Sequence, residues 1–293
     1  MTSSSPFTCV LDARASLGEC PLWSLAERAL YWVDINAPSL NRFDPATGES
    51  RTMPMPASIG SFVFRAGGGF VVALRSGIWL ADAAGRLGPK AAAAPYELPH
   101  HRFNDGRCDP QGRFVVGTMN ENRDAADAAL YRLDADFALT RLFGGLTISN
   151  GLAWSPDGRT MYHADTPTRT VLAYDYDAGS APPSNPRRFA QWHGETERPD
   201  GGAIDSAGNY WIAFYRGGKV LQLSPRGERI AEYPVPAMCP TMCAFGGDDL
   251  RTLFVTSARQ EREPVELVRL PQSGGIFAMR VDVPGLPEAQ FAG

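Results

Sequence analysis

The chain contains 293 residues, of which 44% are hydrophobic and 20% are charged. It is long enough for one large β domain or two ordinary domains with a sizeable core, and this composition excludes membrane-embedded and disordered classes. The formal net charge is -4 and the basic residues are spread along the chain, so nucleic acid is not an expected partner.

Residues 1–10 contain neither a basic segment nor a long apolar run, so the sequence predicts no secretory leader, no membrane association and a cytoplasmic location. The five cysteines are scattered, which is typical of reduced thiols and not of a disulfide framework. Cys239 and Cys243 lie close together in CPTMC, but no second pair of similar spacing accompanies them. Both are therefore expected to be buried thiols and not zinc ligands.

The predicted elements are short strands joined by turns, beginning with a lone strand at 7–13. After it, apolar stretches alternate with turn signals such as DPATG, SPDGR and DSAG. The strand pairs recur at a spacing of about 40 to 50 residues, which is the range of propeller blades. The six repeating units cover 20–35 with 37–49, 59–87, 104–119 with 129–143, 150–165 with 170–177, 200–228, and 242–258 with 274–283.

Helix-period patterning is nearly absent, and the alanine run 91–94 is expected to be a loop because Pro95 ends it at once. Six units of about four strands each favour an all-β, six-bladed β-propeller, because each blade can bury its faces only against its neighbours. The sequence thus predicts a single propeller domain over residues 1–293. The strand at 7–13 is expected to pair with the last blade, since the ring would otherwise end in an open edge.

Polar residues stand at the entrance of the first strand in several units, where the innermost strands of a propeller surround its central channel. Glu19, Asn150 and Asp200 would converge there from the first, fourth and fifth blades. Hard oxygen ligands with two negative charges suit a divalent cation, so a central metal site is predicted. Asn and Asp before glycine are also common turn formers, and the alternative that these residues only make turns stays open.

Four stretches carry a resemblance to a known family. They are LGECPLW at 17–23, RFNDGRCDPQGRFVVGTM at 102–119, ISNGLAWSPDGRTMYHAD at 148–165 and RPDGGAIDSAGNYWIA at 198–213. These stretches resemble, in order, the motifs of the SMP-30/gluconolactonase/regucalcin family. The resemblance implies a six-bladed propeller that holds one divalent cation and hydrolyses sugar lactones, here in the manner of the bacterial members.

By this resemblance, Glu19, Asn150 and Asp200 are the metal ligands. The identity of the ion stays open among calcium, zinc, manganese, magnesium and iron(II). Arg102 and Asn104 are implied to bind substrate, and both are expected to offer hydrogen-bond donors.

The family often has an acidic residue after the GTM motif, and either Glu121 or Asn122 could contact substrate in that role here. Arg198 and His193 precede Asp200 and could line the channel mouth. A zinc site would need three of the four histidines to meet, and only His101 is placed near the mouth. Histidines with structural partners are therefore expected instead.

The implied function is metal-dependent hydrolysis of aldonolactones, such as xylono-, arabinono-, galactono- or gluconolactone, to the aldonic acid in a sugar oxidation pathway. The protein would then be a hydrolase of carboxylic ester bonds, with Asp200 as both metal ligand and general base. The alternative is a non-catalytic metal- or ligand-binding propeller of the regucalcin type. A WD-repeat scaffold is disfavoured because the GH and WD signatures are missing. The expected state is a monomer or weak homo-oligomer.

Overall fold

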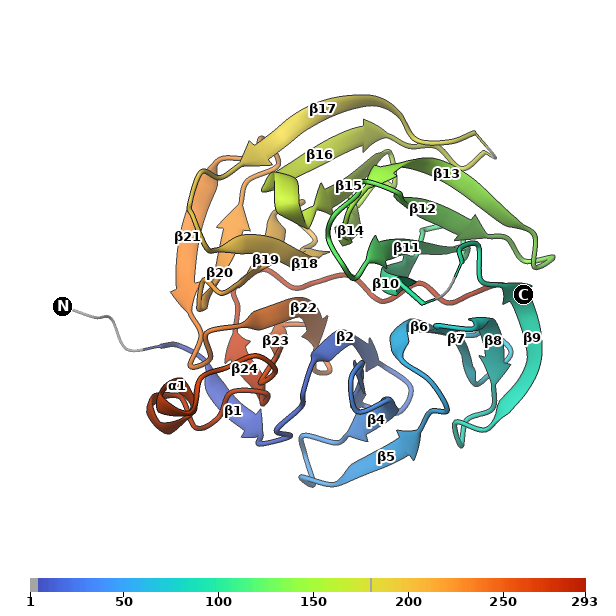
Figure 1. The fold of residues 1–293 in the computed structure, drawn as a ribbon. Coiled ribbons are helices and arrows are strands. Elements are labelled where there is room, and N and C mark those ends of the chain that lie inside the picture. Colours follow the sequence, from blue (N-terminus) through green and yellow to red (C-terminus); the bar gives the residue numbers. More distant parts are fainter. Residues whose placement is uncertain (1–4, 98, 180) are drawn as a thin grey trace.

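The computed structural model describes residues 5–97, 99–179 and 181–293 and consists of six four-stranded sheets arranged as blades around a central axis (Figure 1). The predicted all-β, six-bladed propeller is confirmed. Residues 1–4, part of the segment in which the sequence predicts no leader, lie outside the described residues. Within the described ranges, no helix is long and apolar enough to cross a membrane.

In the first three blades, the strands lie in chain order from the axis outwards. Blade one contains β2 (Gly18–Ser24), β3 (Ala29–Asp34), β4 (Ser39–Phe43) and β5 (Ser50–Pro54). Blade two contains β6 (Ile59–Phe64), β7 (Phe70–Leu74), β8 (Gly77–Ala81) and β9 (Leu87–Ala93). Blade three contains β10 (His101–Cys108), β11 (Phe114–Asn120), β12 (Ala128–Leu133) and β13 (Leu139–Leu146).

The next two blades repeat this order, and the sixth departs from it. Blade four contains β14 (Ser149–Trp154), β15 (Thr160–Asp165), the 3-10 turn η1 (Thr166–Thr168), β16 (Thr170–Asp175) and β17 (Ser184–Gln191). Blade five contains β18 (Arg198–Ile204), β19 (Tyr210–Tyr215), β20 (Lys219–Leu223) and β21 (Arg229–Pro234). Blade six contains β22 (Pro240–Gly246), β23 (Thr252–Ser257) and β24 (Ile276–Arg280), and its outer strand is β1 (Thr8–Leu11), which pairs antiparallel with β24.

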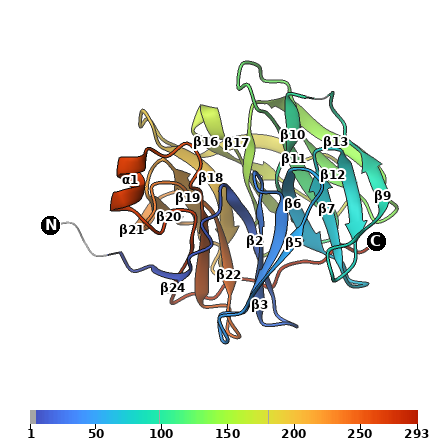
Figure 2. The ribbon, with the colours of Figure 1, turned by 60° about the horizontal axis from the view of Figure 1, so that its bottom comes forward.

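Two segments differ from the sequence-based expectation. The alanine run 91–94 was expected to be a loop, but Ala91 to Ala93 belong to β9, where Ala92 pairs with Ile78 of β8. Pairing with a preformed neighbour outweighs the weak strand preference of alanine, and Pro95 only ends the strand. A short helix, α1 (Pro264–Arg269), occupies the charged connection in blade six and projects from the edge of the ring (Figure 1, Figure 2). Proline in its first turn is compatible with a helix start.

The innermost strand of every blade is interrupted by a bulge near its start. The pairing between first and second strands shifts register between residues 19 and 22, 59 and 61, 103 and 106, 150 and 153, 199 and 202, and 240 and 243. A bulge bends the strand and turns a side chain away from the regular alternation. The side chains of all six innermost strands therefore change direction at the same height along the axis.

Glycines at this level allow neighbouring blades to approach closely. Gly151 has a φ of 65°, and a Cβ atom there would lie 2.6 Å from the hydroxyl of Tyr210 in blade five. A Cβ atom on Gly201 would lie 2.3 Å from Cγ of Met242 in blade six. A larger residue at either position would collide with the next blade, so the glycines that follow the polar residues in the sequence reflect crowding around the axis.

The segment after β24, which we call the closing segment (residues 282–292), crosses the ring (Figure 1). Its hydrogen bonds place it on the side opposite the strand entrances. Its backbone forms hydrogen bonds with Leu250, Ser206, Gly112 and Phe64, which lie near the far ends of inner strands in blades six, five, three and two. Glu288 of this segment forms an ion pair of 3.3 Å with Arg107 of β10. The closing segment thus covers one end of the central channel.

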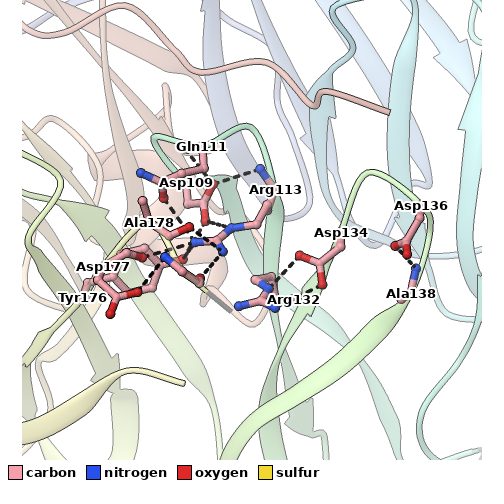
Figure 3. A network of polar contacts seen from close by, with 11 residues as sticks. Asp109, Gln111, Arg113, Arg132, Asp134, Asp136, Ala138, Tyr176, Asp177 and Ala178 are labelled. Carbon is pink, nitrogen blue, oxygen red and sulfur yellow. Dashed lines mark hydrogen bonds and ion pairs between the residues drawn. The ribbon is translucent and has the colours of Figure 1, made fainter. Parts of the chain in front are cut away.

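Blades three and four are joined by a buried polar network centred on Arg113 (Figure 3). Its Nε lies 2.5 Å from Oδ2 of Asp109, whose carboxylate is fully buried and also accepts a 2.6 Å hydrogen bond from the Tyr176 hydroxyl. Arg113 donates further to Tyr176 and to the backbone carbonyl of Gly179. Because the buried Asp109 charge depends on these partners, the network is expected to stabilise the contact between the two blades.

We expect Arg113→Leu to lower the free energy of unfolding by about 3 kcal/mol, because it leaves the buried Asp109 carboxylate without its cationic partner. Urea denaturation followed by tryptophan fluorescence would measure the change.

Blade two provides a matched control for this variant. Arg86 and Asp82 occupy the same kind of turn and form a 2.7 Å ion pair, but the Arg86 side chain is 82% exposed. Arg86→Leu should therefore change stability little, because exposed ion pairs contribute little. Equal losses in the two variants would contradict the role assigned to the buried pair.

Candidate active site

A pocket of about 380 Å³ opens at the end of the ring where the inner strands begin. This volume is typical of small-molecule sites. The pocket is lined by the metal and substrate residues predicted from the sequence, with the exception of Glu121: Glu19, Arg102, Asn104, Asn150 and Asp200. Blades one, three, four and five thus bring these side chains together around the axis.

The bulges explain how these side chains reach the axis. Glu19 and Asn150 occupy the last paired position before the bulge in β2 and β14, whereas Asn104 and Asp200 lie inside the bulge of β10 and β18. All four are almost fully buried, with exposed fractions between 4% and 9%. Their polar atoms are therefore shielded from bulk solvent and interact with neighbouring protein groups and with whatever occupies the pocket.

A chain of hydrogen bonds fixes the orientation of the two amides. Arg102 Nη1 donates to Oδ1 of Asn104 at 2.7 Å, so the Asn104 amide must present its oxygen to the arginine. Its Nδ2 then donates to the backbone carbonyl of Ser149 at 2.9 Å and to Oδ1 of Asn150 at 3.0 Å. The other end of Asn150 donates to Thr166 Oγ1, at 2.8 Å. Asn150 therefore keeps a fixed oxygen with one lone pair unused.

Thr166 is a site residue that the sequence reasoning missed. It lies at the start of η1, lines the pocket, and passes the hydrogen bond on to the carbonyl oxygen of Pro199 at 3.0 Å. It thus links the amide of Asn150 in blade four to the backbone beside Asp200 in blade five. Its position directly after the strand that ends at Asp165 was the available signal.

The two carboxylates of the site repel each other and lack strong partners. Burial, followed by the charges of Asp200 and Asp105, raises the pKa of Glu19 well above its usual range. Burial and Asp105 likewise raise the pKa of Asp200, although Arg102 and Arg123 oppose the shift. Glu19 accepts one hydrogen bond, a 3.3 Å contact from its neighbour's backbone N–H.

These features fit a divalent cation. A positive ion between Glu19 and Asp200 would relieve their repulsion, and the free lone pair of the Asn150 oxygen supplies a neutral third ligand of the hard type that such ions prefer. Across the described residues, no three His, Cys, Asp or Glu side chains gather as a metal-binding group. The predicted set does not require one, because it contains two carboxylates and an amide.

Glu121 lies beside the pocket and holds two arginines. Its carboxylate is 2.6 Å from Arg75 Nη1 and 3.4 Å from Arg102 Nε. Burial alone would raise the pKa of Glu121, but the hydrogen bond from Arg75 and the charge of Arg102 outweigh it and lower the pKa. Asn122 is exposed, and its backbone N–H donates to Asn120. A direct contact of Glu121 or Asn122 with substrate stays a prediction.

Four further arginines line the outer part of the pocket. They are Arg123, Arg169, Arg198 and Arg216. Burial and the charges of Arg169, Arg216 and Arg123 lower the pKa of Arg198, so the charges of the other three arginines act on this guanidinium group. Of these four arginines, only Arg198 was predicted from the sequence to line the mouth. His193, its suggested companion, is exposed and is not among the residues that line this pocket.

Both cysteines and two of the histidines considered as zinc ligands are buried or contact other side chains. Cys239 and Cys243 are buried free thiols, as predicted. His101 forms a 2.9 Å contact with Asp127. His163 is 2% exposed, and its Nε2 shares a 2.8 Å hydrogen bond with the hydroxyl of Ser149. Burial lowers the pKa of His163 from 6.5 to about 3, so this histidine is neutral in the folded protein at neutral pH.

Fold and pocket together define a six-bladed propeller with a buried, carboxylate-containing site on its axis. Residues 17–259 match the family described as SMP-30/Gluconolactonase/LRE-like region, and the chain belongs to this family. The resemblance identified in the sequence motifs is therefore confirmed.

Three related proteins illustrate this membership. A 6-deoxy-6-sulfogluconolactonase of Pseudomonas putida is 48% identical over 97% of this chain and 98% of that protein. Regucalcin of Oryctolagus cuniculus is 35% identical over 99% of this chain and all of that protein. The crystal structure of a calcium-binding protein, regucalcin from Agrobacterium tumefaciens, has a TM-score of 0.92 at 29% identity and covers 97% of this chain and 96% of its own. The predicted enzyme class, a lactonase, is confirmed by the family and the Pseudomonas relative.

The low pKa of His163 predicts a pH dependence of stability. Its folded-state pKa lies below the unfolded value of 6.5, so the unfolded state binds more protons below that pH and stability is lost as the pH falls toward about 3. We expect His163→Gln, which cannot titrate, to lose about 2 kcal/mol less than the wild type between pH 7 and pH 5.

Urea denaturation of both proteins at several pH values would measure this difference. The relevant quantity is the difference in slope, because the substitution also changes packing against Phe143, whose ring lies 5.4 Å from the imidazole. Parallel pH profiles would contradict the assignment of a neutral, buried histidine.

Proposed function

We propose that this protein hydrolyses sugar lactones to the corresponding aldonic acids with the help of one divalent cation held by Glu19, Asn150 and Asp200. The observation that carries the proposal is the pair of buried, mutually repelling carboxylates inside a pocket of sugar-sized volume. Family membership and the name of the Pseudomonas relative support lactone hydrolysis as the reaction. Aldonolactones with or without a charged substituent are candidate substrates, and a sugar oxidation pathway would supply them.

When bound, a divalent cation would polarise the lactone carbonyl and lower the pKa of water in the site. We assign the proton transfer to Asp200, whose buried carboxylate accepts a backbone hydrogen bond from Gly201 but none from a side chain in the part of the chain that the structure describes. Asp200 takes a proton from water as the water oxygen attacks the carbonyl carbon. The bond between this carbon and the ring oxygen then breaks, and the ring oxygen takes the proton from Asp200 to become a hydroxyl, which restores the Asp200 carboxylate.

Arg102 and Asn104 have different capacities to bind the substrate. Arg102 uses Nη1 on Phe103 and Asn104, and its Nε faces Glu121, which leaves the donors of Nη2 for a substrate oxygen. Asn104 was expected to offer donors, but both of its N–H groups are occupied by Ser149 and Asn150. Its oxygen has a second lone pair and can accept from a sugar hydroxyl. Donor and acceptor together would fix the orientation of the ring.

The regucalcin type provides a second candidate, a propeller that binds a divalent cation without catalysis. The likeness to the Agrobacterium structure, which is described as a calcium-binding protein, favours it. The two candidates differ in whether the bound ion accelerates a reaction. A test is the hydrolysis of a panel of aldonolactones by chelator-treated protein, before and after addition of calcium, magnesium, manganese, zinc or iron(II).

Hydrolysis that requires added metal would support the lactonase. Binding of one ion per chain in calorimetry without hydrolysis of any lactone would support the binding protein. Failure to bind any of these ions would contradict the proposed ligand set itself.

We expect Asp200→Asn to remain at least about 10²-fold slower than the wild type even at saturating metal, because the substitution removes the proton acceptor but retains an oxygen ligand. Glu19→Gln removes one charge from the ion's surroundings but leaves the base, so saturating metal should restore more of its activity. Metal titrations of kcat for both variants would separate weaker metal binding from slower chemistry. Recovery of Asp200→Asn to wild-type kcat would move the base to Asp105, Glu121 or bulk hydroxide.

Arg102→Ala should weaken transition-state binding by about 2 kcal/mol, the contribution of a charged hydrogen bond, and should lower kcat/KM accordingly. The metal content should stay at one ion per chain. Steady-state kinetics and elemental analysis of the same preparation would check both parts. A variant that loses its metal would show that Arg102 supports the ligands, through Asn104 and Asn150, and not the substrate.

A further inference from the structure

Four arginines form a one-sided rim around the mouth of the pocket, which we call the arginine rim (Arg123, Arg169, Arg198 and Arg216). Three of them lie in connections between the second and third strands of blades three, four and five, and each has a positive φ, of 60°, 55° and 59° respectively. Arg198 begins β18 at the same end, where it pairs with Tyr215. Three consecutive blades thus supply guanidinium groups to one side of the pocket.

The arginine rim has few carboxylate partners. Arg123 and Arg198 have no side-chain hydrogen bond or ion pair within the described residues. Arg169 donates from Nη2 to the backbone carbonyl of Glu195, but its Nε is buried without any acceptor. Arg216 approaches Glu261 only to 3.6 Å, in a pair whose side chains are 44% and 56% exposed.

The nearby acidic groups are already engaged elsewhere. Glu121 holds Arg75 and Arg102, and Glu197 lies 2.9 Å from Lys219. Among the residues that line the pocket there are five arginines and two carboxylates, Glu19 and Asp200. If the carboxylates balance a divalent cation, the positive charge of the rim is left without compensation.

A neutral aldonolactone would not compensate this charge. Guanidinium groups are suited to oxyanions, because they offer several donors in a plane and lose less hydration than an ammonium group. Clustered like charges are costly, and their repulsion is relieved when an anion binds between them. The rim arginines are more exposed than the buried carboxylates of Glu19 and Asp200, so they lie nearer the mouth, although the charge of Arg123 still acts on Asp200. The anion should therefore be carried by the part of the substrate farthest from the reacting carbonyl.

We propose that the arginine rim binds a tetrahedral oxyanion, a sulfonate or a phosphate, on the terminal carbon of the sugar lactone. This inference rests on the proposed lactonase function. It assigns a substrate class to the pocket, with the lactone carbonyl near Asp200 and the charged end between Arg123, Arg169, Arg198 and Arg216.

The test compares three six-carbon lactones that differ only at carbon 6: gluconolactone, its 6-phosphate and its 6-deoxy-6-sulfonate. We expect the wild-type kcat/KM to be at least about 10-fold higher for one or both charged lactones than for gluconolactone, because each charge-assisted hydrogen bond lost with the neutral sugar costs roughly a factor of ten or more. The ratio between the two charged lactones identifies the preferred anion. The preference should also decrease as salt is added.

Arg123→Gln and Arg198→Gln should each reduce this preference, and the double variant should reduce it further than either single variant, by about 10-fold or more in total. Arg123 makes no side-chain hydrogen bond in the described structure, so Arg123→Gln removes no side-chain hydrogen bond of the fold. Arg226→Gln is the matched control, because Arg226 lies in an exposed turn between β20 and β21 and does not line the pocket. Its preference should equal that of the wild type.

A binding measurement makes the outcome independent of turnover. In calorimetry with the metal-loaded protein, 6-phosphogluconate or 6-deoxy-6-sulfogluconate should bind at least about 10-fold more tightly than gluconate, which carries only the product carboxylate. Equal kcat/KM for charged and neutral lactones would overturn the arginine-rim proposal and leave the lactonase intact. Absence of hydrolysis for all three lactones would overturn the proposed lactonase function. The arginine-rim proposal would then be tested by the binding measurement alone.

Discussion

The crowding of six inner strands around one axis is the constraint on which the site depends. Each strand breaks its pairing at the same level, and glycines such as Gly151 and Gly201 allow the next blade to lie against it. The bulges place Glu19, Asn104, Asn150 and Asp200 side by side although they come from four different blades. The rigidity of the site is therefore a property of the whole ring, because no single blade contains it.

The carboxylates and arginines of the pocket are held in positions that disfavour their charges. Burial raises the pKa values of Glu19 and Asp200 at the centre, and neighbouring arginines lower the pKa of Arg198 at the mouth, so the ionised forms of these groups are disfavoured in the folded chain. Networks such as Asp109 with Arg113 and Tyr176 are placed between blades, away from the pocket, where their groups are fully paired. The ring can thus hold unfavourable charges at its axis because its blades are joined elsewhere.

Much of the architecture could be predicted from the sequence because a repeated strand and turn pattern is local. The approach of Glu19, Asn150 and Asp200 could be predicted as well, since all three stand at strand entrances. The bulges could not be predicted, because the pairing register of a strand depends on its partner strand. Arg123, Arg169 and Arg216 occupy ordinary connections and become neighbours only when the ring closes. It could also not be predicted that both N–H groups of Asn104 are occupied, because their acceptors, Ser149 and Asn150, lie in the next blade.

The closing segment determines how molecules travel to and from the axis. Residues 282–292 lie across the far end of the ring, where Glu288 pairs with Arg107, so the pocket opens at the end where the inner strands begin. Substrate and water would therefore enter, and product would leave, through the same opening of the pocket, so product must leave before the next substrate binds. In the proposed reaction, opening of a lactone would create a new carboxylate near Asp200, and the acid formed there would leave past the arginine rim at the mouth.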